Sequence, residues 1–345
     1  MFAIQYNELG SSDVLNYTQV NKPSPKDGEV LIELKAASLN HLDLHFRRGL
    51  PGMKSPLPHI PGSDGAGIVV QNGSLASKFN KGDRVLINPG MPCGICDRCK
   101  NKQENLCHQY RLFGRENNGT YAQYTCVPEQ NLLPIPSGVD FYSASAFALT
   151  YLTAWSMLMG KAQLKPKQTV LVMGAGSGVS CAAIQIAKFF KCTVFTTAST
   201  QEKRQKAKDL LQVDECIDYT KVAIDKEIRS LTDKQGVDVI IDHVGGEQWV
   251  PLLKSARNGG KIISCGATAG FDPKTDLRHI FYRQVQILGS TMGTWQEMQD
   301  VYQHFIAGHL KPIIDSVFPL KDAAKAQDKM ENRQSFGKIV LDIPY

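Results

Sequence analysis

A chain of 345 residues is too long for one hydrophobic core of ordinary size, so its length predicts two domains. Lys and Arg exceed Asp and Glu by only 39 − 33 = 6, with no run of five like charges, which argues against a nucleic-acid partner. No stretch of eighteen apolar residues and no signal-peptide pattern occurs, and the nine cysteines are an odd number. We therefore expect a soluble cytoplasmic protein that acts on a small molecule and does not bind a membrane.

Residues 1–130 show the pattern of a mostly β domain. Residues 30–36 alternate as a half-buried strand does, and clusters of proline and glycine punctuate residues 56–67. Near the C-terminus, residues 336–341 return to a strand pattern. We therefore expect the segment 294–345 to rejoin the first domain.

Four cysteines lie close together within this domain, in residues 93–107. Their spacing, C-x2-C-x2-C-x7-C, can close a tetrahedron of thiolates around Zn²⁺ with no open position for water, which is typical of a structural site. An iron–sulfur ferredoxin run would place its fourth cysteine after three residues and follow it with proline. Four thiols that are free or paired with one another are the alternative. The spacing favours one structural zinc, with the ligands Cys93, Cys96, Cys99 and Cys107.

From residue 131 the pattern changes to helix, and then strands and helices alternate. Residues 169–173 form a continuous apolar run, as in a parallel strand buried on both faces, and residues 179–190 follow with amphipathic spacing. Alternation of this kind implies right-handed βαβ units. Residues 131–293 therefore predict a Rossmann domain with a doubly wound parallel sheet. Its further strands are predicted at residues 194–197, 237–242, 261–265 and 285–288.

A glycine-rich turn, residues 174–180, connects the first of these strands to its helix. Glycines let the backbone approach a pyrophosphate, and the N–H groups at a helix start can bind it. The spacing departs from a strict G-x-G-x-x-G because its last position is Ser180. Its place between a buried strand and a long helix nevertheless supports a dinucleotide site. The candidate cofactor residues here are Gly174, Ala175, Ser177, Gly178 and Val179.

The end of the next strand bears on which dinucleotide binds. An NAD site usually offers a carboxylate about 20 residues beyond the glycine turn, for the ribose hydroxyls. This chain has hydroxyl residues there, including Ser199, and then Lys203 and Arg204, which could bind a 2′-phosphate. The pattern favours NADPH over NADH. The alternative is that both cations only belong to the solvated face of the next helix.

Taken together, these motifs resemble those of the medium-chain dehydrogenase/reductase superfamily, which contains zinc alcohol dehydrogenases and quinone oxidoreductases. The resemblance covers essentially the whole chain, and it implies an α/β protein with a GroES-like, mostly β catalytic domain and a Rossmann domain. It also implies an active site between the domains, and homodimers or homotetramers built edge to edge through residues 285–292. Besides the cysteines and the glycine turn, it rests on segments 61–67 (PGSDGAG), 82–85 (GDRV) and 119–122 (GTYA).

The chain departs from the alcohol dehydrogenases at the positions that bind their catalytic zinc. The resemblance places Asn40 at the first cysteine ligand, Ser63-Asp64 at a His-Glu pair, and Leu149 at the second cysteine. Asn, Ser and Leu lack the thiolate, imidazole or carboxylate that Zn²⁺ favours. Leu42 also replaces the hydroxyl that begins the alcohol dehydrogenase proton relay. We therefore predict that a catalytic zinc is absent.

The remaining pattern is similar to the quinone oxidoreductase branch, which has Asn at the first ligand position and transfers hydride without a metal. The likeness implies NADPH-dependent reduction of a quinone or of an α,β-unsaturated carbonyl, such as an enone, an alkenal or an enoyl thioester. It also implies that Tyr219 contacts the 2′-phosphate and that Lys338 reaches the cofactor. The nicotinamide half of the cofactor is expected against Val244, Gly266 and Ala267.

Without zinc, a hydrogen-bond donor must stabilise the developing oxyanion, and Asn40 is the candidate amide. Asp43 is expected to orient this loop, through His41 or a water, and Thr153 to contact the nicotinamide carboxamide. Asn40 could instead simply cap the helix that begins there, since Asn is a favoured N-cap. Asp43 could instead be a surface residue or a supporting partner of neighbouring side chains.

Two rival functions remain open at this point. The first is a zinc alcohol dehydrogenase with unusual ligands, drawn from Asp43, His45 and Asp64. Chelator-sensitive oxidation of simple alcohols would indicate it. The second is an NADPH-binding structural or regulatory protein, which would bind the dinucleotide tightly without turnover.

Overall fold

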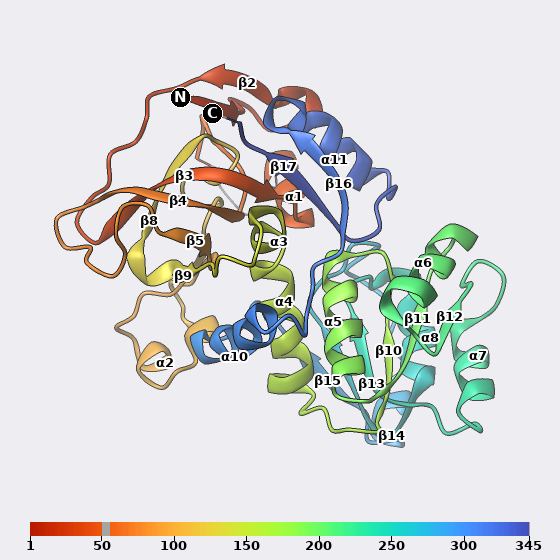
Figure 1. The fold of residues 1–345 in the computed structure, drawn as a ribbon. Helices are drawn as coiled ribbons and strands as arrows, with labels where there is room; N and C mark the ends of the chain where they lie inside the picture. The colour runs from red at the N-terminus through yellow and green to blue at the C-terminus, as the bar shows by residue number, and fades with distance from the viewer. Residues whose placement is uncertain (50–55, 345) are drawn as a thin grey trace. The chain divides into compact units, whose positions relative to one another are not determined.

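The computed structural model describes residues 1–49 and 56–344 (Figure 1). The chain divides into two compact units, each with its own sheet and core. The first unit comprises residues 1–149, 294–298 and 302–345, and the second comprises residues 150–293 and 299–301.

The division near residue 149 differs from the boundary predicted at residue 130. Strand β9 (Leu132–Pro134) pairs with β5 (Arg84–Ile87). Helix α3 (Phe141–Ser145) packs on β3 (Glu29–Ser38) and β4 (Asp64–Asn72) of the same unit. Residues 131–149 therefore belong to the first unit, because their backbone hydrogen bonds and contacts are made there. The helical pattern in this stretch does not mark the start of the Rossmann unit.

A seven-stranded sheet with the order β16-β17-β3-β4-β5-β9 forms the centre of the first unit, with β8 also paired to β3. All of its pairs are antiparallel except β16 with β17. The C-terminal strand β17 places Leu341 opposite Ala37 of β3, so the end of the chain lies in this sheet. The remaining bounds are β8 (Tyr124–Pro128), β16 (Ile314–Pro319) and β17 (Lys338–Asp342).

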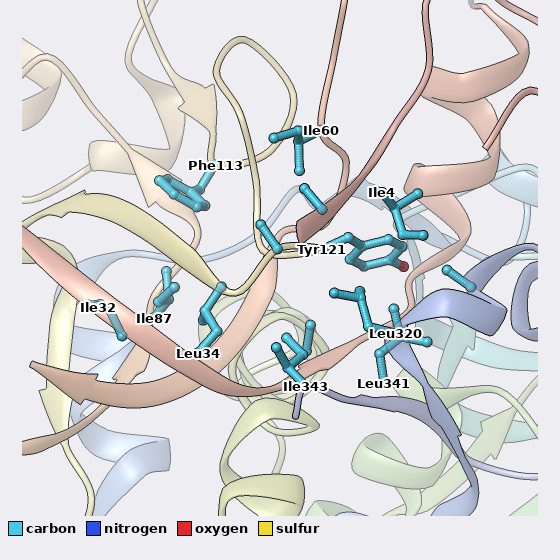
Figure 2. Close-up of a cluster of buried hydrophobic side chains, with 14 of the residues drawn as sticks. Ile4, Ile32, Leu34, Ile60, Ile87, Phe113, Tyr121, Leu320, Leu341 and Ile343 are labelled. Atoms are coloured by element: carbon cyan, nitrogen blue, oxygen red, sulfur yellow. The ribbon is translucent and has the colours of Figure 1, made fainter. Parts of the chain in front are cut away.

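Side chains of this sheet fill a continuous apolar core (Figure 2). Ile32 and Leu34 of β3 are buried, whereas Glu33 between them is partly exposed, so the predicted alternation holds here. Tyr121 and Leu341 complete the same cluster from other parts of the chain. Removing such side chains from water is the main stabilising contribution to a fold of this kind.

Smaller elements complete the first unit. Strand β1 (Phe2–Gln5) pairs with β2 (Asn16–Gln19), and β6 (Gly90–Met91) pairs with β7 (Arg111–Leu112) on either side of the four-cysteine segment. Its helices are α1 (His41–Arg48), α2 (Asp97–Lys100), α3 and α11 (Ala323–Glu331), while α4 (Ala148–Trp155) and α10 (Trp295–Ile306) have residues in both units.

The second unit contains a six-stranded, all-parallel sheet with the order β12-β11-β10-β13-β14-β15. Val170, Leu171 and Val172 of β10 are fully buried, as the continuous apolar run predicted. The strands are β10 (Thr169–Val172), β11 (Thr193–Thr197), β12 (Glu215–Ile217), β13 (Val237–Asp242), β14 (Ala256–Ser264) and β15 (Gln286–Gly289). The helices are α5 (Gly178–Phe189), α6 (Gln201–Leu211), α7 (Ile224–Leu231), α8 (Trp249–Ser255) and α9 (Arg278–Phe281).

Strand order reverses direction in this sheet at β10, which lies between β11 and β13. In a doubly wound sheet, a ligand binds beyond the carboxyl ends of the strands at such a switch point. The predicted α/β fold class, with a mostly β unit and a Rossmann unit, is confirmed. Within the described residues, no helix is both long and apolar enough to span a bilayer.

Candidate functional site

The four-cysteine segment folds into a compact cluster between β6 and β7. The four sulfur atoms all lie within 4.8 Å of one another, with the Cys96 and Cys99 sulfurs 3.5 Å apart. The backbone N–H groups of Cys93 and Gln109 donate to the Cys107 sulfur at 3.5 and 3.3 Å, which stabilises a thiolate there. Four cysteine sulfurs in this arrangement fit a tetrahedral structural zinc. In the described part of the chain, no second group of three or more His, Cys, Asp or Glu side chains has such an arrangement.

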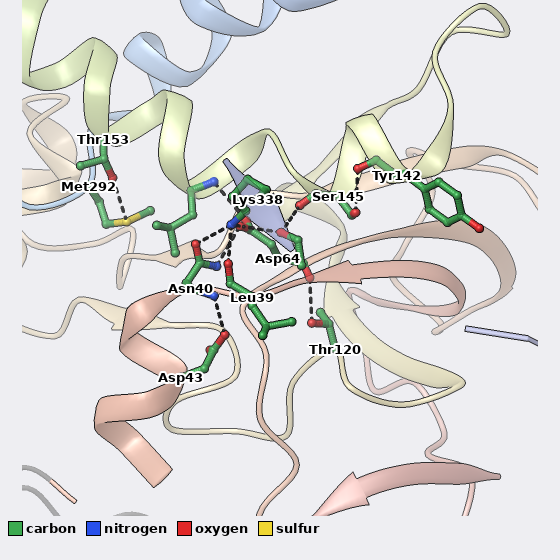
Figure 3. A network of polar contacts seen from close by, with 12 residues as sticks. Leu39, Asn40, Asp43, Asp64, Thr120, Tyr142, Ser145, Thr153, Met292 and Lys338 are labelled. Atoms are coloured by element: carbon green, nitrogen blue, oxygen red, sulfur yellow. Dashed lines mark hydrogen bonds and ion pairs between the residues drawn. The ribbon is translucent and has the colours of Figure 1, made fainter. Parts of the chain in front are cut away.

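Asp64, at the start of β4, is the centre of a buried polar network in the first unit (Figure 3). Its Oδ1 accepts from the backbone N–H of Leu149 at 3.0 Å, and its Oδ2 accepts from the Asn40 side-chain amide at 2.9 Å. Two of the three predicted ligand positions therefore do converge, but on a carboxylate. The third, Ser63, is buried, and its hydroxyl has no hydrogen-bond partner among the described residues.

Lys338 supplies the positive charge of this network from the start of β17. Its ammonium donates to Leu39 O at 2.8 Å, to Asn40 Oδ1 at 2.7 Å and to Asp64 Oδ2 at 3.2 Å. Burial lowers the pKa of Lys338, and the Asp64 carboxylate opposes that shift. We predicted that Lys338 reaches the cofactor. In the structure its ammonium is bound to three oxygen atoms of the first unit, and a contact with the cofactor stays a prediction.

The turn before β17 brings Lys338 to this position. Gly337 has a φ of 103°, and a Cβ atom there would lie 2.3 Å from the carbonyl oxygen of Ile313. Only glycine permits both this conformation and this approach. The Lys338 N–H in turn donates to the same Ile313 carbonyl at 2.8 Å, which starts the strand.

Asn40 caps a helix, and its side chain also belongs to the buried polar network. It is the N-cap residue of α1, and its backbone N–H donates to Asp43 Oδ2 at 2.8 Å, the N3 half of a capping box. Its side chain meanwhile bridges Asp64 and Lys338. The amide nitrogen carries two protons, and one of them is donated to Asp64.

Asp43 orients Asn40 from within the core. Its Oδ2 also accepts from the Tyr121 hydroxyl at 3.0 Å, whereas its buried Oδ1 has no hydrogen-bond partner in the described chain. Burial raises the pKa of Asp43 to about 7, against the opposing hydrogen bond from Asn40. Asp43 is therefore not a surface residue. The expected partner His41 is exposed, and Tyr121, which the sequence analysis did not single out, takes its place.

The unusual zinc ligands that the sequence left open do not assemble. Asp43 is bound to Asn40 and Tyr121, and Asp64 is bound to Asn40 and Lys338. His45 forms no metal-binding group with either of them.

The predicted glycine turn forms the start of α5 in the second unit. Gly174 has a φ of 67°, its N–H donates to Thr197 Oγ1 at 3.0 Å, and the Ala175 N–H donates to Thr197 O at 2.9 Å. Ser177 is the N-cap, and its hydroxyl oxygen accepts from the Ser180 N–H at 3.0 Å. The turn places Gly178 and Val179 in the first turn of α5, where backbone N–H groups have no acceptor within the helix, and Ala175 just before it, which suits a pyrophosphate.

The residues that follow β11 and β12 match only in part the pattern that was expected for an NADPH site. Thr200 caps α6, and Ser199 and Lys203 lie next to that cap. Tyr219 follows the end of β12. Arg204, however, pairs with Asp218 at 2.8 Å, so a carboxylate that is distant in sequence does reach this region.

The remaining cofactor candidates also lie at carboxyl ends of parallel strands. Val244 follows β13, and Gly266 and Ala267 follow β14. Val244 O accepts from the Ala269 N–H at 2.8 Å, which ties the two loops together. Thr153, on α4, is buried, and its hydroxyl lies 3.8 Å from the Met292 sulfur (Figure 3).

A mostly β unit with a cysteine lobe, joined to a Rossmann unit with a glycine turn at its switch point, defines a dinucleotide-dependent dehydrogenase or reductase. Residues 26–137 match the family model of the alcohol dehydrogenase GroES-like domain, and residues 178–307 match that of the zinc-binding dehydrogenases. The chain belongs to the medium-chain dehydrogenase/reductase superfamily and is an NAD(P)H-dependent oxidoreductase.

Individual relatives carry two different names. A solved structure described as an NAD-dependent alcohol dehydrogenase is 42% identical, covers all of both chains and superposes with a TM-score of 0.96. An NAD-dependent alcohol dehydrogenase of Saccharolobus solfataricus is 29% identical over 99% of both chains. A quinone oxidoreductase of Sus scrofa is 30% identical over 99% of this chain and 97% of its own.

Proposed function

We propose that this oxidoreductase reduces a quinone or an α,β-unsaturated carbonyl with NADPH and without a catalytic zinc. The observation that carries the proposal is the Asn40–Asp64–Lys338 network, in which a buried ammonium and an amide occupy the region of the predicted ligand positions. An ammonium bound to the same carboxylate and amide leaves no set of anionic or imidazole donors for Zn²⁺.

Asn40 has the chemistry of an oxyanion donor. When bound, the dinucleotide would supply a hydride to the substrate, whose carbonyl oxygen would then gain negative charge and need a hydrogen-bond donor. The second amide proton of Asn40 is available to this oxygen, since the first is donated to Asp64. The Lys338 ammonium, 2.7 Å from Asn40 Oδ1, polarises the amide and makes it a stronger donor. A solvent proton then completes the product.

A substrate panel combined with metal analysis tests this function. The wild-type protein should oxidise NADPH with quinones, alkenals or enoyl thioesters, and it should contain close to one Zn per chain. Asn40→Ala should lower kcat/KM by about 10²- to 10³-fold, the usual effect of removing one oxyanion donor. Asn16→Ala, at an exposed asparagine of β2, is the matched control. Two zinc ions per chain, or full activity of Asn40→Ala, would contradict the proposal.

For the cofactor, Ser199, Lys203 and Tyr219 would bind the 2′-phosphate of NADPH. Arg204 is not included among the residues proposed to bind the 2′-phosphate, because its charge is paired with that of Asp218. NADH is the alternative, supported by that nearby carboxylate and by the relatives described as NAD-dependent. We expect a lower KM for NADPH than for NADH, and a reversal of that preference in the charge-removing variant Lys203→Met. A lower KM for NADH in the wild type would decide for the alternative.

The second candidate function is that of an alcohol dehydrogenase, which the 42% identical structure favours. Oxidation of simple alcohols that a chelator abolishes would support it. Chelator-resistant reduction of enones would argue against it.

A further inference from the structure

His243, which directly follows β13, lies against the glycine turn of the second unit. Its Nε2 atom is within hydrogen-bond distance of three oxygen atoms: Ser177 Oγ at 3.0 Å, Ser180 Oγ at 2.9 Å and Met173 O at 3.1 Å. A Cβ atom on Gly174 would lie 3.5 Å from the ring carbon Cε1. The imidazole therefore supports the turn from the side of β13.

The hydrogen bonds around this ring determine where its proton lies. The Ser180 hydroxyl donates to Met173 O at 2.6 Å, so neither of these oxygens offers a proton to the imidazole. A ring nitrogen 3.1 Å from a carbonyl oxygen makes a favourable contact only as a donor. Nε2 therefore carries a proton, and it donates toward Met173 O and the serine oxygens.

The proton on Nε2 influences which acceptor the Ser177 hydroxyl can donate to. That oxygen already accepts from the Ser180 N–H at 3.0 Å, and its own proton can go to Ser180 Oγ at 2.8 Å or to a ligand. Because Nε2–H can donate to Ser180 Oγ, the Ser177 proton becomes available to an anion at the helix start.

Asp242 is the charged group that acts on this imidazole within the described residues. Asp242 is adjacent on β13, and its carboxylate accepts from the N–H groups of Val244 at 2.8 Å and Gly245 at 3.3 Å. Burial raises the pKa values of the thiols of Cys181 and Cys265 to about 12, so both stay neutral near physiological pH. Burial also lowers the pKa of His243, against the opposing charge of Asp242, which favours the uncharged imidazole in the free protein.

We propose that His243 is a positioning residue of the dinucleotide site, which frees the Ser177 hydroxyl for the pyrophosphate and takes up one proton when the pyrophosphate binds. The inference rests on the proposed dinucleotide site and adds a proton-linked residue to it. The second proton comes from solvent and binds Nδ1, so that an imidazolium lies beside the phosphate charges. The pKa of His243 is then higher in the complex than in the free protein. By linkage, the affinity for the dinucleotide falls as pH rises between these two pKa values.

Isothermal titration of the full-length protein with ADP-ribose from pH 5.5 to 8.5 tests this coupling. ADP-ribose contains the pyrophosphate but neither the nicotinamide nor a 2′-phosphate, whose own pKa of about 6 would interfere. We expect its Kd to rise with pH by up to about tenfold per pH unit, the limit for one linked proton. Adenosine, which lacks phosphate, should show no such slope.

Variants and a spectroscopic readout separate the possible outcomes. His243→Gln retains an Nε2 donor that cannot be charged, so the slope for ADP-ribose should fall below about twofold over the whole range. Any pH dependence of the Kd that remains in this variant would come from the titration of Asp242. His309→Gln, at an exposed histidine of the first unit, should behave as wild type. In proton NMR, the His243 resonance, assigned by its loss in His243→Gln, should shift its midpoint to higher pH when ADP-ribose is added.

Each outcome decides between the two proposals. A wild-type Kd that changes less than twofold with pH, or a His243 midpoint that does not rise, overturns the role of His243 while leaving the dinucleotide site intact. Absence of binding by ADP-ribose, NADPH and NADH alike would overturn the dinucleotide site itself. Should His243→Gln fail to fold, the wild-type slope and midpoint still decide.

Discussion

Lys338 and Asp64 form the most deeply buried ion pair among the described residues, with 4% and 0% of their side chains exposed. A buried pair is costly to desolvate, and it persists when additional hydrogen bonds satisfy its remaining protons and lone pairs. Here Leu39 O, the Asn40 amide and the Leu149 N–H satisfy them. The pair therefore holds Asn40 in one orientation, which is what an oxyanion donor requires.

Lys338→Met should destabilise the protein strongly, because it leaves the Asp64 carboxylate buried without its cation. We expect a loss of about 3–5 kcal/mol in the free energy of unfolding, measured by urea denaturation. Lys338→Arg should lose less, since it keeps the charge. Adding Asp64→Asn to Lys338→Met should restore part of the loss, and strictly additive effects of the two substitutions would contradict a direct coupling.

A second prediction at the scale of a residue concerns Asp43 and the pH dependence of protein stability. Its pKa of about 7 in the folded protein lies above the ordinary value of 3.8, so the folded state binds this proton more tightly than the unfolded state does. The contribution of Asp43 to stability is therefore present at low pH and is lost as pH rises from about 4 to about 7. Asp43→Asn lacks this loss, so it should gain stability relative to wild type between pH 5 and pH 8, on the order of 3 kcal/mol.

Thermal and urea unfolding at several pH values measure this difference. Asp233→Asn removes a carboxylate from an exposed position and serves as the control, with no pH-dependent difference expected. A constant difference between Asp43→Asn and wild type across this range would show that Asp43 is ionised throughout.

At the scale of elements, the cysteine lobe depends on few other contacts. Helix α2 has four residues, and none of them is buried. A segment with so little apolar burial does not hold a single conformation without a cross-link, and a tetrathiolate zinc supplies one.

Removal of the zinc should therefore unfold this segment locally. In Cys96→Ser we expect zinc content to fall from about one per chain to near zero, and amide hydrogen exchange to rise in residues 93–107 while β10 stays protected. Mass spectrometry of exchanged peptides and of the metal content gives both readouts. Cys126→Ser, outside the cluster, should keep its zinc. Unchanged exchange in zinc-free Cys96→Ser would show that the lobe folds without metal.

At the scale of the whole molecule, we propose that two copies associate through β15, which ends the parallel sheet. An edge strand offers unpaired backbone groups to a second chain. Exposed apolar side chains accompany this edge: Ile287 within the strand is 39% exposed, and Phe281 and Tyr282 before it are 59% and 73% exposed. The opposite edge strand, β12, has only three residues.

Ile287→Lys should shift the protein toward a monomer, because it places a charge within the proposed interface. Size-exclusion chromatography with light scattering measures the mass. Val222→Lys introduces the same charge at a similarly exposed apolar position, 42% exposed, and should leave the mass unchanged. A wild-type protein that is already monomeric would contradict the proposed interface.

Sequence alone predicted the features whose signals are local. The zinc lobe rests on four cysteines within fifteen residues, and the parallel sheet rests on apolar runs that alternate with amphipathic helices. The glycine turn and its helix are also contiguous. In each of these cases, the residues that interact lie within one loop or one βα unit, so their spacing in the sequence is enough to predict the structure.

Tertiary structure alone decided the contacts between distant segments. Asn40 and Lys338 are separated by 298 residues, and no periodicity or motif indicates that β17 would deliver an ammonium beside α1. The same holds for Tyr121 with Asp43, for Arg204 with Asp218, and for residues 131–149, whose helical pattern concealed their pairing with the first sheet. The sequence determined which side chains are absent from the zinc positions. The antiparallel pairing of β17 with β3 determined that a buried lysine is present there instead.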